Sequence, residues 1–364
     1  MSQPSTTSFK RHLAQYKTLL DADLADYTTT IQARTQKDYG ERSLVAVDPY
    51  CALLQAGGKR IRGRLVMIGY EMMCGTDQKM IIQAARALEM IHAYILIVDD
   101  VQDRSHTRRG SPTAHRIITQ QHQSNGWKND PDHLGISLAL NGALLGLHAA
   151  EMVLANLEVP DELRVKAINI TNHTMMITIH GQTNDLLNEI ADDVSSDTLK
   201  NVMQWKTAHY TLLNPLHVGM VLADAGCEDT NAITQYALHT GYAFQITDDL
   251  LLFSTAKDNS GKDPIDDIRE GKQTILTVHA AVSASPKDAT FVALCLGKKD
   301  LTNDEFERFK QVLIDCGAVG QARQQASEHV AIARQSLVEH KDRWKPESVA
   351  FLDELAQYIL DRKK

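Results

Sequence analysis

The 364-residue sequence predicts an all-α fold, built as a single large helical bundle. Apolar residues recur at three and four positions in segment after segment, which is the period of a helix with one buried face. Strand-type alternation of apolar and polar residues is nearly absent, and only nine prolines interrupt the chain. The 43% hydrophobic content is ample for a sizeable core.

The same periodicity places the helices in chain order and gives some of them a physical boundary. Thr302 and Glu305 form a capping-box pattern at the start of one helix, and Gly317 is well placed to end it. The clearest loops are the polar stretches at residues 122–133 and 254–267. The predicted helices cover residues 8–34, 48–56, 60–75, 77–104, 132–156, 161–190, 196–226, 231–255, 271–283, 302–316, 318–341 and 346–362.

No stretch rich in Pro, Gly or Ser separates these helices, so we expect one domain over residues 9–364 after a flexible N-terminus at 1–8. The net charge of −8 argues against a nucleic-acid partner. Five scattered cysteines without a CxxC motif fit a reducing, cytoplasmic location. The longest apolar stretch, at 134–150, is shorter than the ~20 residues of a membrane helix, so we expect no transmembrane segment.

An acidic cluster follows an apolar run in the segment IVDDVQDRSHTRRG at residues 97–110. On a helix, Asp99 and Asp103 are four positions apart and project from one face, with Asp100 to one side. Like charges at this spacing weaken a helix unless a cation lies between them. Taken alone, such a DDxxD pattern is more often a solvated helix end than a metal site.

A second acidic pair, Asp248 and Asp249, ends the apolar run at 240–253 and repeats this design. Carboxylates from two such elements are the hard oxygen ligands that Mg²⁺ takes together with substrate phosphates. The chain has neither the glycine-rich loop of nucleotide-binding proteins nor a dinucleotide fingerprint, so we expect a diphosphate held through metal. The basic residues after the second pair are Lys257, Lys262 and Lys272.

The residues resemble the trans-isoprenyl diphosphate synthases, which elongate allylic diphosphates with isopentenyl diphosphate. The resemblance covers about residues 45–285 and implies antiparallel helices around a deep central cavity, a homodimer and three Mg²⁺ ions. It rests on six motifs in the family's order: GGKRIRG at 57–63, DDVQDRSHTRRG at 99–110, GQTNDL at 181–186, KTA at 206–208, FQITDD at 244–249 and GKDPIDDIREGK at 261–272.

The resemblance also implies roles for individual residues. Asp99, Asp103 and Asp248 would bind metal, with Asp100 and Asp249 supporting them. Thr207 and Gln245 would stabilise the allylic cation near Lys206, and Gln182 and Asp185 would assist the metal site or form a polar helix patch. The residues implied for the allylic diphosphate are Arg108, Lys206, Thr207, Gln245, Lys262 and Lys272. Those implied for isopentenyl diphosphate are Gly58, Lys59, Arg62, His92, Arg109 and Phe244.

Two positions depart from the family pattern. Leu252 stands where many members have a third acidic residue, and Asn141 and Gly142 occupy a region that often carries an aspartate. The first departure raises the alternative of a non-catalytic regulatory subunit of another synthase. A class I terpene cyclase is a further alternative, because it also uses DDxxD with Mg²⁺ but needs no isopentenyl site.

Product length depends on the residues one turn before Asp99, where a growing chain would pass. These are Tyr94 and Ile95. An aromatic ring there would act as a floor, and one aromatic at the fifth position resembles geranylgeranyl diphosphate synthases, which make C20. Aromatics at both positions would suggest a farnesyl diphosphate synthase. The plainer reading is that Tyr94 only packs in the core.

Overall fold

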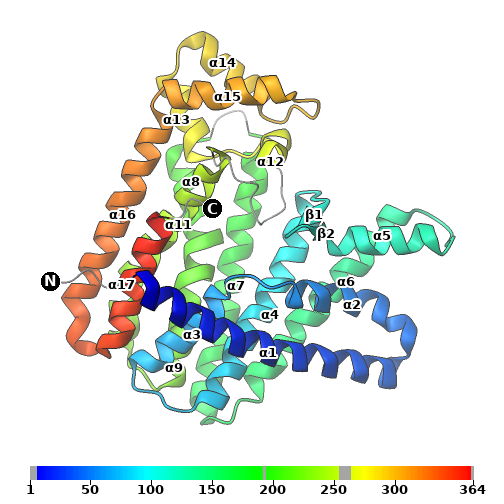
Figure 1. Ribbon diagram of the computed structural model, residues 1–364, viewed down its shortest axis with the longest axis vertical. Coiled ribbons are helices and arrows are strands. Elements are labelled where there is room, and N and C mark those ends of the chain that lie inside the picture. The colour runs from blue at the N-terminus through cyan, green and yellow to red at the C-terminus, as the bar shows by residue number, and fades with distance from the viewer. Residues whose placement is uncertain (1–5, 192–193, 254–263, 362–364) are drawn as a thin grey trace. The chain divides into compact units, whose positions relative to one another are not determined.

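The structure is a computed structural model that describes residues 6–191, 194–253 and 264–361 (Figure 1). The predicted all-α class is confirmed, because helices make up nearly all of the regular structure in these ranges. Their only strands are β1 (Thr107–Arg108) and β2 (Ser111–Pro112), which pair antiparallel in a small hairpin. The described residues group into two compact units.

The first unit comprises residues 6–168 and 215–224. Helix α4 packs against both α3 and α6, and α2 packs against α6. Figure 1 shows the β1–β2 hairpin beside α5, where the chain turns back after α4. The elements of this unit are α1 (Thr6–Tyr39), η1 (Glu41–Ser43), α2 (Leu44–Gln55), α3 (Ile61–Met72), α4 (Gln78–Gln102), β1, β2, α5 (Ala114–Ser124), α6 (Pro131–Ala155), the start of α7 (Asp161–Asn188) and most of α9 (Asn214–Leu222).

Small residues on α6 allow α2 to approach closely. A Cβ atom at Gly142 would lie 2.2 Å from the Ala46 carbonyl oxygen, and one at Gly146 would lie 2.1 Å from the Tyr50 ring. Tyr50 in turn donates a hydrogen bond of 3.2 Å to the Met90 carbonyl of α4. Gly142, which departs from the family pattern in sequence, is therefore explained by the packing of α2 on α6.

The second unit comprises the described residues of 169–214, 225–253 and 264–361. Helix α11 packs against η2, α16 and α17, so it forms the centre of this unit. Its elements are the rest of α7, α8 (Ser196–Val202), the π-helix η2 (Met203–Leu213), α10 (Cys227–Ala232), α11 (Thr234–Asp249), η3 (Leu250–Phe253), α12 (Pro264–Glu270), α13 (Ile275–Ser283), α14 (Pro286–Cys295), α15 (Asn303–Asp315), α16 (Ala318–His340), η4 (Lys341–Arg343) and α17 (Pro346–Leu360).

Several predicted boundaries agree with the structure and others need correction. The Thr302–Glu305 capping box is present, and Gly317 has a φ of +84° just after α15. Helices α5, α12 and α14 and most of α10 were not predicted, and the single helix expected at 196–226 is wrong because η2 divides it. The expected loop at 254–267 is wrong at 264–267, which belong to α12, and its other residues lie outside the described ranges. Helix α1 begins at Thr6, inside the stretch expected to be a flexible N-terminus.

Two helices of the described chain are long and apolar enough to cross a membrane, α4 and α6. Slightly more than half of the most apolar window of α4, 56%, is buried inside the protein, against 33% for α6. Core helices of other proteins meet the same length and composition criteria.

Candidate active site

The last turn of α4 and the hairpin after it bring acidic and basic side chains together. The chain leaves the helix tightly, because the Asp103 amide donates to the Asp99 carbonyl at 2.8 Å and the Ser105 amide donates to the Asp100 carbonyl at 2.9 Å. The β1–β2 pairing then returns Arg108 to the helix end. Its Nε donates to Asp100 Oδ1 at 2.6 Å, and its Nη2 donates to Asp99 Oδ2 at 3.2 Å.

Burial raises the pKa of one acid in this cluster, Asp100. Asp100 is only 1% exposed, and burial raises its pKa to about 7 although Arg108 favours the charged form. For Arg108, burial works against the charge, but Asp100 and Asp99 outweigh it and the pKa is raised. Asp99 and Asp103 are only partly buried. Asp99 and Asp100 therefore share the guanidinium of Arg108.

These acids fit Mg²⁺ by their chemistry. Asp99 and Asp103 offer partly exposed carboxylate oxygens one turn apart, the hard donors that Mg²⁺ prefers. Within the described ranges, no group of three or more His, Cys, Asp or Glu side chains is arranged to hold a metal ion. Mg²⁺ does not need such a cage, because it usually binds through one or two carboxylates, water and substrate phosphates.

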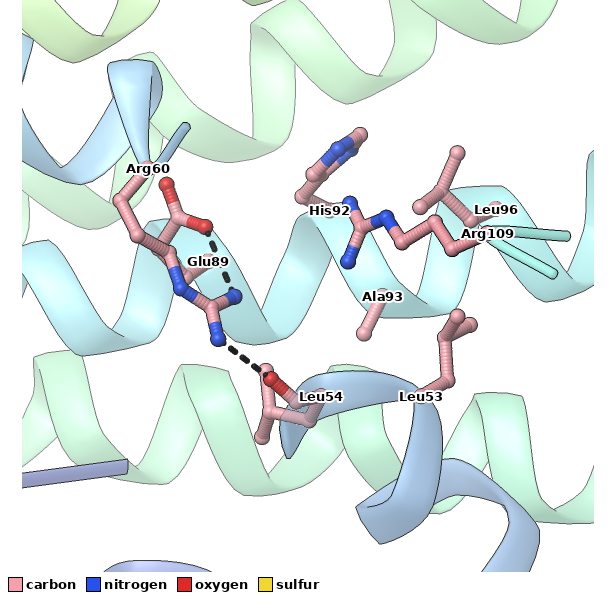
Figure 2. Close-up of a pocket in the computed structure, with 8 residues that line it drawn as sticks. All are labelled: Leu53, Leu54, Arg60, Glu89, His92, Ala93, Leu96 and Arg109. Atoms are coloured by element: carbon pink, nitrogen blue, oxygen red, sulfur yellow. Dashed lines mark hydrogen bonds and ion pairs between the residues drawn. The ribbon is translucent and has the colours of Figure 1, made fainter. Parts of the chain in front are cut away.

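The GGKRIRG segment forms a glycine turn that meets Arg109. Arg109 Nη1 donates a hydrogen bond to the Gly57 carbonyl. A Cβ atom at Gly58 would lie 3.0 Å from Arg109 Nη2, so only glycine fits this approach without displacement. Figure 2 shows Arg109 and His92 lining one part of a small pocket, with Arg60 and Glu89 at another. Gly58 was predicted to permit the close approach of isopentenyl diphosphate, which stays a prediction, and in the structure it permits that of Arg109.

Several guanidinium groups surround His92. Arg62 Nη1 lies 3.3 Å from His92 Nε2. The pKa of His92 lies well below its usual range, because burial and then the charges of Arg62, Arg109, Arg108 and Arg60 disfavour the imidazolium. Burial and neighbouring arginines also lower the pKa of Arg109. This region is therefore strongly positive, and an anion bound there would relieve the repulsion.

In the second unit, the π-helix η2 carries Lys206 and Thr207. Lys206 Nζ donates to Asp185 Oδ2 of α7 at 2.6 Å, and Asp185 is only 7% exposed. A Cβ atom at Gly181 would lie 2.4 Å from the Lys206 amide nitrogen, so α7 and η2 are in close backbone contact. π-Helical turns are rare, and those that occur are frequently at functional sites.

A hydrogen-bonded chain links η2 to the acidic end of α11. Thr207 Oγ1 donates to Gln245 Oε1 at 2.7 Å, and Gln245 Nε2 donates to Asp249 Oδ1 at 2.9 Å. The amide of Gln245 is therefore oriented from both sides. Burial raises the pKa of Asp249 to about 7, opposed by the charge of Lys272 and the hydrogen bond from Gln245. Asp248 and Phe244 are partly buried on the same helix.

Each unit thus brings together part of the predicted site. The first unit joins Asp99 and Asp100 to Arg108, and the GGKRIRG turn to His92 and Arg109. Lys59 is exposed on that turn, and Tyr94 and Ile95 are partly buried on α4, five and four residues before Asp99. Lys257 and Lys262 lie outside the described residues.

Sequence reasoning missed two features of the site. Arg60 and Glu89 are almost fully buried beneath the GGKRIRG turn, although charged residues in a glycine-rich segment are typical of a solvated surface. The π-helical form of residues 203–213 was also missed, because its side-chain pattern continues that of the α-helices on either side. The nearest signal in the sequence was Gly181, whose missing side chain permits the contact with Lys206.

The chain is similar to known proteins over most of its length. Residues 45–313 match the family model described as polyprenyl synthetase. Geranylgeranyl pyrophosphate synthase from Geoglobus acetivorans is 32% identical over 310 residues, covering 85% of this chain and 88% of the relative. Geranylfarnesyl diphosphate synthase from Aeropyrum pernix is 28% identical, covering 86% and 92%.

Solved structures give the same result. The crystal structure of geranylgeranyl pyrophosphate synthase from Corynebacterium glutamicum, complexed with isoprenyl diphosphate and magnesium, is 29% identical with a TM-score of 0.89, covering 96% of this chain and 99% of that one. The polyprenyl synthase from Caulobacter crescentus, complexed with calcium and isoprenyl diphosphate, is 25% identical with a TM-score of 0.77, covering 97% and 98%.

These findings confirm the predicted fold class and the predicted enzyme class, a trans-prenyltransferase of the short-chain type. The chain belongs to the polyprenyl synthetase family.

Proposed function

We propose that this prenyltransferase condenses isopentenyl diphosphate with an allylic diphosphate, such as dimethylallyl, geranyl or farnesyl diphosphate, to form geranylgeranyl diphosphate (C20). The observation that carries this proposal is the pairing of two opposite charge clusters along α4. Asp99 and Asp100 lie at its end, while His92, two turns earlier, is surrounded by arginines. A reaction between two diphosphates needs both an acidic site for metal and a basic site without metal.

Asp99, Asp103 and Asp248 would hold Mg²⁺, three ions in all, with Asp100 and Asp249 supporting them. When bound, Mg²⁺ neutralises the allylic diphosphate and makes it a leaving group. The magnesium and calcium complexes of related synthases support the use of a divalent ion. The side chains that would hold the allylic diphosphate are Arg108, Lys206, Lys262 and Lys272.

Ionisation breaks the bond between C1 of the allylic group and its diphosphate oxygen. The fixed Thr207 hydroxyl and Gln245 amide would direct dipoles at the resulting cation, near Lys206. The alkene of isopentenyl diphosphate, near Phe244, then attacks C1, and a proton is lost to the released diphosphate. Water must be excluded while the cation exists, because it would otherwise quench it.

Isopentenyl diphosphate would bind to the positive region around the GGKRIRG turn. Lys59, Arg62 and Arg109 would contact its phosphates, and Gly58 would permit the close approach of Arg109 and of the substrate to the turn. His92, held neutral by its surroundings, would complete the site with a hydrogen bond rather than a charge.

The C20 product rests on Tyr94 as a floor below Asp99, with Ile95 beside it. The names of the related geranylgeranyl synthases support this length. A relative named geranylfarnesyl diphosphate synthase is 28% identical, and the assay that follows measures the length of the product.

The purified chain alone, incubated with Mg²⁺, farnesyl diphosphate and labelled isopentenyl diphosphate, should form labelled geranylgeranyl diphosphate. Omission of either diphosphate should abolish the product. A hydrocarbon formed from the allylic diphosphate alone would instead identify a terpene cyclase. Absence of any product until another synthase is added would identify a regulatory subunit, and a labelled product that ends at C15 from dimethylallyl diphosphate would identify a farnesyl synthase.

We also propose that the chain is a cytoplasmic homodimer. Helix α6 exposes the large apolar side chains of Leu144, Leu145 and Met152, which a second copy would cover. All five cysteines are free thiols, as in a reducing compartment. Light scattering should give twice the chain mass of 40.5 kDa, and a monomer would contradict the proposal.

A further inference from the structure

The GGKRIRG turn has an unusual backbone that must be held in place. Gly57 and Gly58 have φ angles of +81° and +128°, which glycine adopts freely. Arg60, however, also lies in the left-handed region, with φ +50° and ψ +37°. A residue with a Cβ atom adopts this conformation at a cost, so the surrounding structure must stabilise it.

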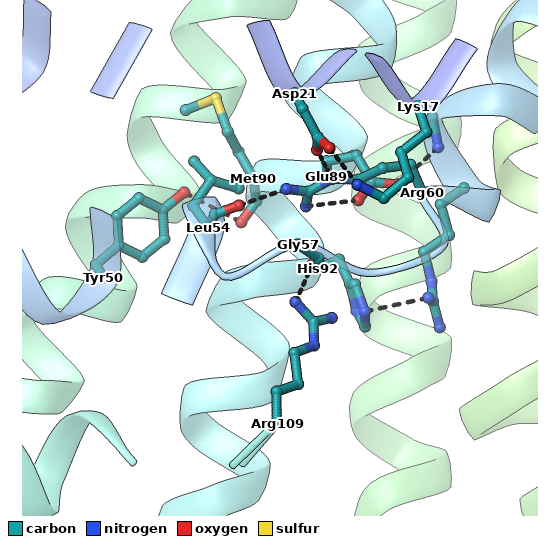
Figure 3. A network of polar contacts seen from close by, with 12 residues as sticks. Lys17, Asp21, Tyr50, Leu54, Gly57, Arg60, Glu89, Met90, His92 and Arg109 are labelled. Carbon is teal, nitrogen blue, oxygen red and sulfur yellow. Dashed lines mark hydrogen bonds and ion pairs between the residues drawn. The ribbon is translucent and has the colours of Figure 1, made fainter. Parts of the chain in front are cut away.

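The buried guanidinium of Arg60 provides that stabilisation (Figure 3). Its Nε donates to Asp21 Oδ1 at 2.8 Å, and its Nη2 donates to the Leu54 carbonyl at 2.7 Å. Its Nη1 lies 3.4 Å from Glu89 Oε2. Arg60 is 6% exposed and Glu89 is 3% exposed, so these charges are removed from water and depend on one another.

Glu89 extends the same network to the first turn of α3. Its Oε1 accepts a hydrogen bond of 2.9 Å from the Gly63 amide, which is one of the unpaired donors at a helix start. A Cβ atom at Gly63 would lie 2.5 Å from the Leu20 side chain and 3.2 Å from Glu89 Cγ. The turn is therefore fixed on both sides of Arg60 against α1 and α4.

The side chains next to Arg60 point elsewhere. Lys59 is exposed, and Arg62 reaches His92. We propose that Arg60 is a positioning residue for isopentenyl diphosphate: anchored by Asp21 and Glu89, it fixes the strained turn that presents Lys59 and Arg62 to the substrate. This inference rests on the proposed isopentenyl diphosphate site.

Through Asp21, helix α1 also helps to hold the GGKRIRG turn, although α1 lies outside residues 45–313 that match the family model. Burial disfavours the Asp21 carboxylate, but hydrogen bonds from Lys17 and Arg60 outweigh this and lower its pKa, so it is charged. Its side chain keeps 32% of its surface exposed, so replacing it perturbs the fold less than replacing Arg60 or Glu89.

Steady-state kinetics of the full chain with the Asp21→Asn substitution tests the proposal. We expect the KM for isopentenyl diphosphate to rise about fivefold to tenfold, with kcat and the KM for farnesyl diphosphate within about twofold of wild type, as for one weakened charge-assisted hydrogen bond. Asp23→Asn is the matched control, because Asp23 lies on the same helix and pairs with Arg86 at 3.1 Å, away from the turn. It should leave both KM values unchanged.

Two further variants distinguish a failure of the positioning role from a failure of the proposed isopentenyl diphosphate site. Arg62→Gln removes a proposed substrate contact and should raise the isopentenyl KM by more than Asp21→Asn does. Arg60→Lys keeps the charge but loses the planar fork, and should raise the same KM while thermal unfolding shows a folded protein. If Arg62→Gln raises the KM but Asp21→Asn and Arg60→Lys do not, the positioning role is wrong. If Arg62→Gln has no effect, the proposed isopentenyl site itself is wrong, and the inference falls with it.

Discussion

Burial raises the pKa of the second aspartate in each acidic pair. The pKa of Asp100 and that of Asp249 are both raised to about 7 by burial. Each is held by a hydrogen-bond donor, Arg108 for Asp100 and Gln245 for Asp249. This similarity supports the proposed division of roles, in which Asp99 and Asp248 bind metal while Asp100 and Asp249 orient the site.

The fifth residue before Asp99 provides a test of product length. Tyr94 lies about 7.5 Å before Asp99 along α4, since each residue of a helix adds about 1.5 Å. Replacing Tyr94 with Ala removes its ring at this depth. We expect products longer than C20 in chromatography of the dephosphorylated prenols. Tyr94→Phe keeps the ring and should still make C20. An unchanged product distribution for Tyr94→Ala would show that other residues form the floor.

At this scale, sequence reasoning succeeded where a pattern has a local physical cause, as in the Thr302–Glu305 capping box. The expectation that Gly58 lets isopentenyl diphosphate approach the backbone closely stays a prediction, and the structure shows Arg109 beside it. Arg60 could not be predicted, because neither a left-handed arginine nor the burial of its side chain leaves a pattern in one sequence. Its partners Asp21 and Glu89 are 39 and 29 positions away along the chain.

At the scale of secondary-structure elements, a histidine pair joins α11 to α16. His239 Nδ1 lies 2.8 Å from His329 Nδ1, so one ring donates and the other accepts. Burial, then His239 and Lys200, lower the pKa of His329 to about 4, and burial and Lys200 also lower that of His239. Protonating both rings would place two N–H groups against each other.

Because of this histidine pair, we expect the folded protein to lose stability in acid. The pKa of His329 in the folded protein lies below the unfolded value of about 6.5. Its contribution to the free energy of unfolding is therefore fully present above pH 6.5 and is lost as the pH falls towards 4. Urea unfolding at a series of pH values should therefore show a weaker acid dependence for His329→Gln than for wild type, by on the order of 1 kcal/mol at pH 4. His148→Gln, at an exposed histidine, is the control. Parallel curves for His329→Gln and wild type would refute the prediction.

The helices that were not predicted from the sequence were missed for separate physical reasons. Helix α5 is amphipathic but mostly polar, because its buried face combines Ile118 with Thr119 and His122, so too few apolar residues mark it in the sequence. Helix α14 did carry a signal, because Ser285 caps it and Pro286 occupies its first turn. The π-helix η2 depends on its neighbours, including the close contact with Gly181, and local sequence preference does not specify it.

At the scale of the whole molecule, the all-α class could be predicted from the helical period of the apolar residues, and the family from six motifs that occur in the family's order along the chain. The prediction of a single domain and of a deep central cavity stays a prediction. The same holds for the roles of Asp99 and Asp248, which belong to different compact units.

The most direct test of the central claim is the Mg²⁺-dependent condensation rate of Asp99→Ala and Asp248→Ala. Each should lose about a thousandfold in kcat, because the diphosphate could no longer be neutralised as it leaves. Asp315→Asn, an acid at the end of α15 that accepts from Gln311 at 2.8 Å, is the control and should keep normal activity. Near-normal kcat in either alanine variant, with the fold intact, would contradict the account that both acidic pairs act in one metal-dependent prenyl transfer.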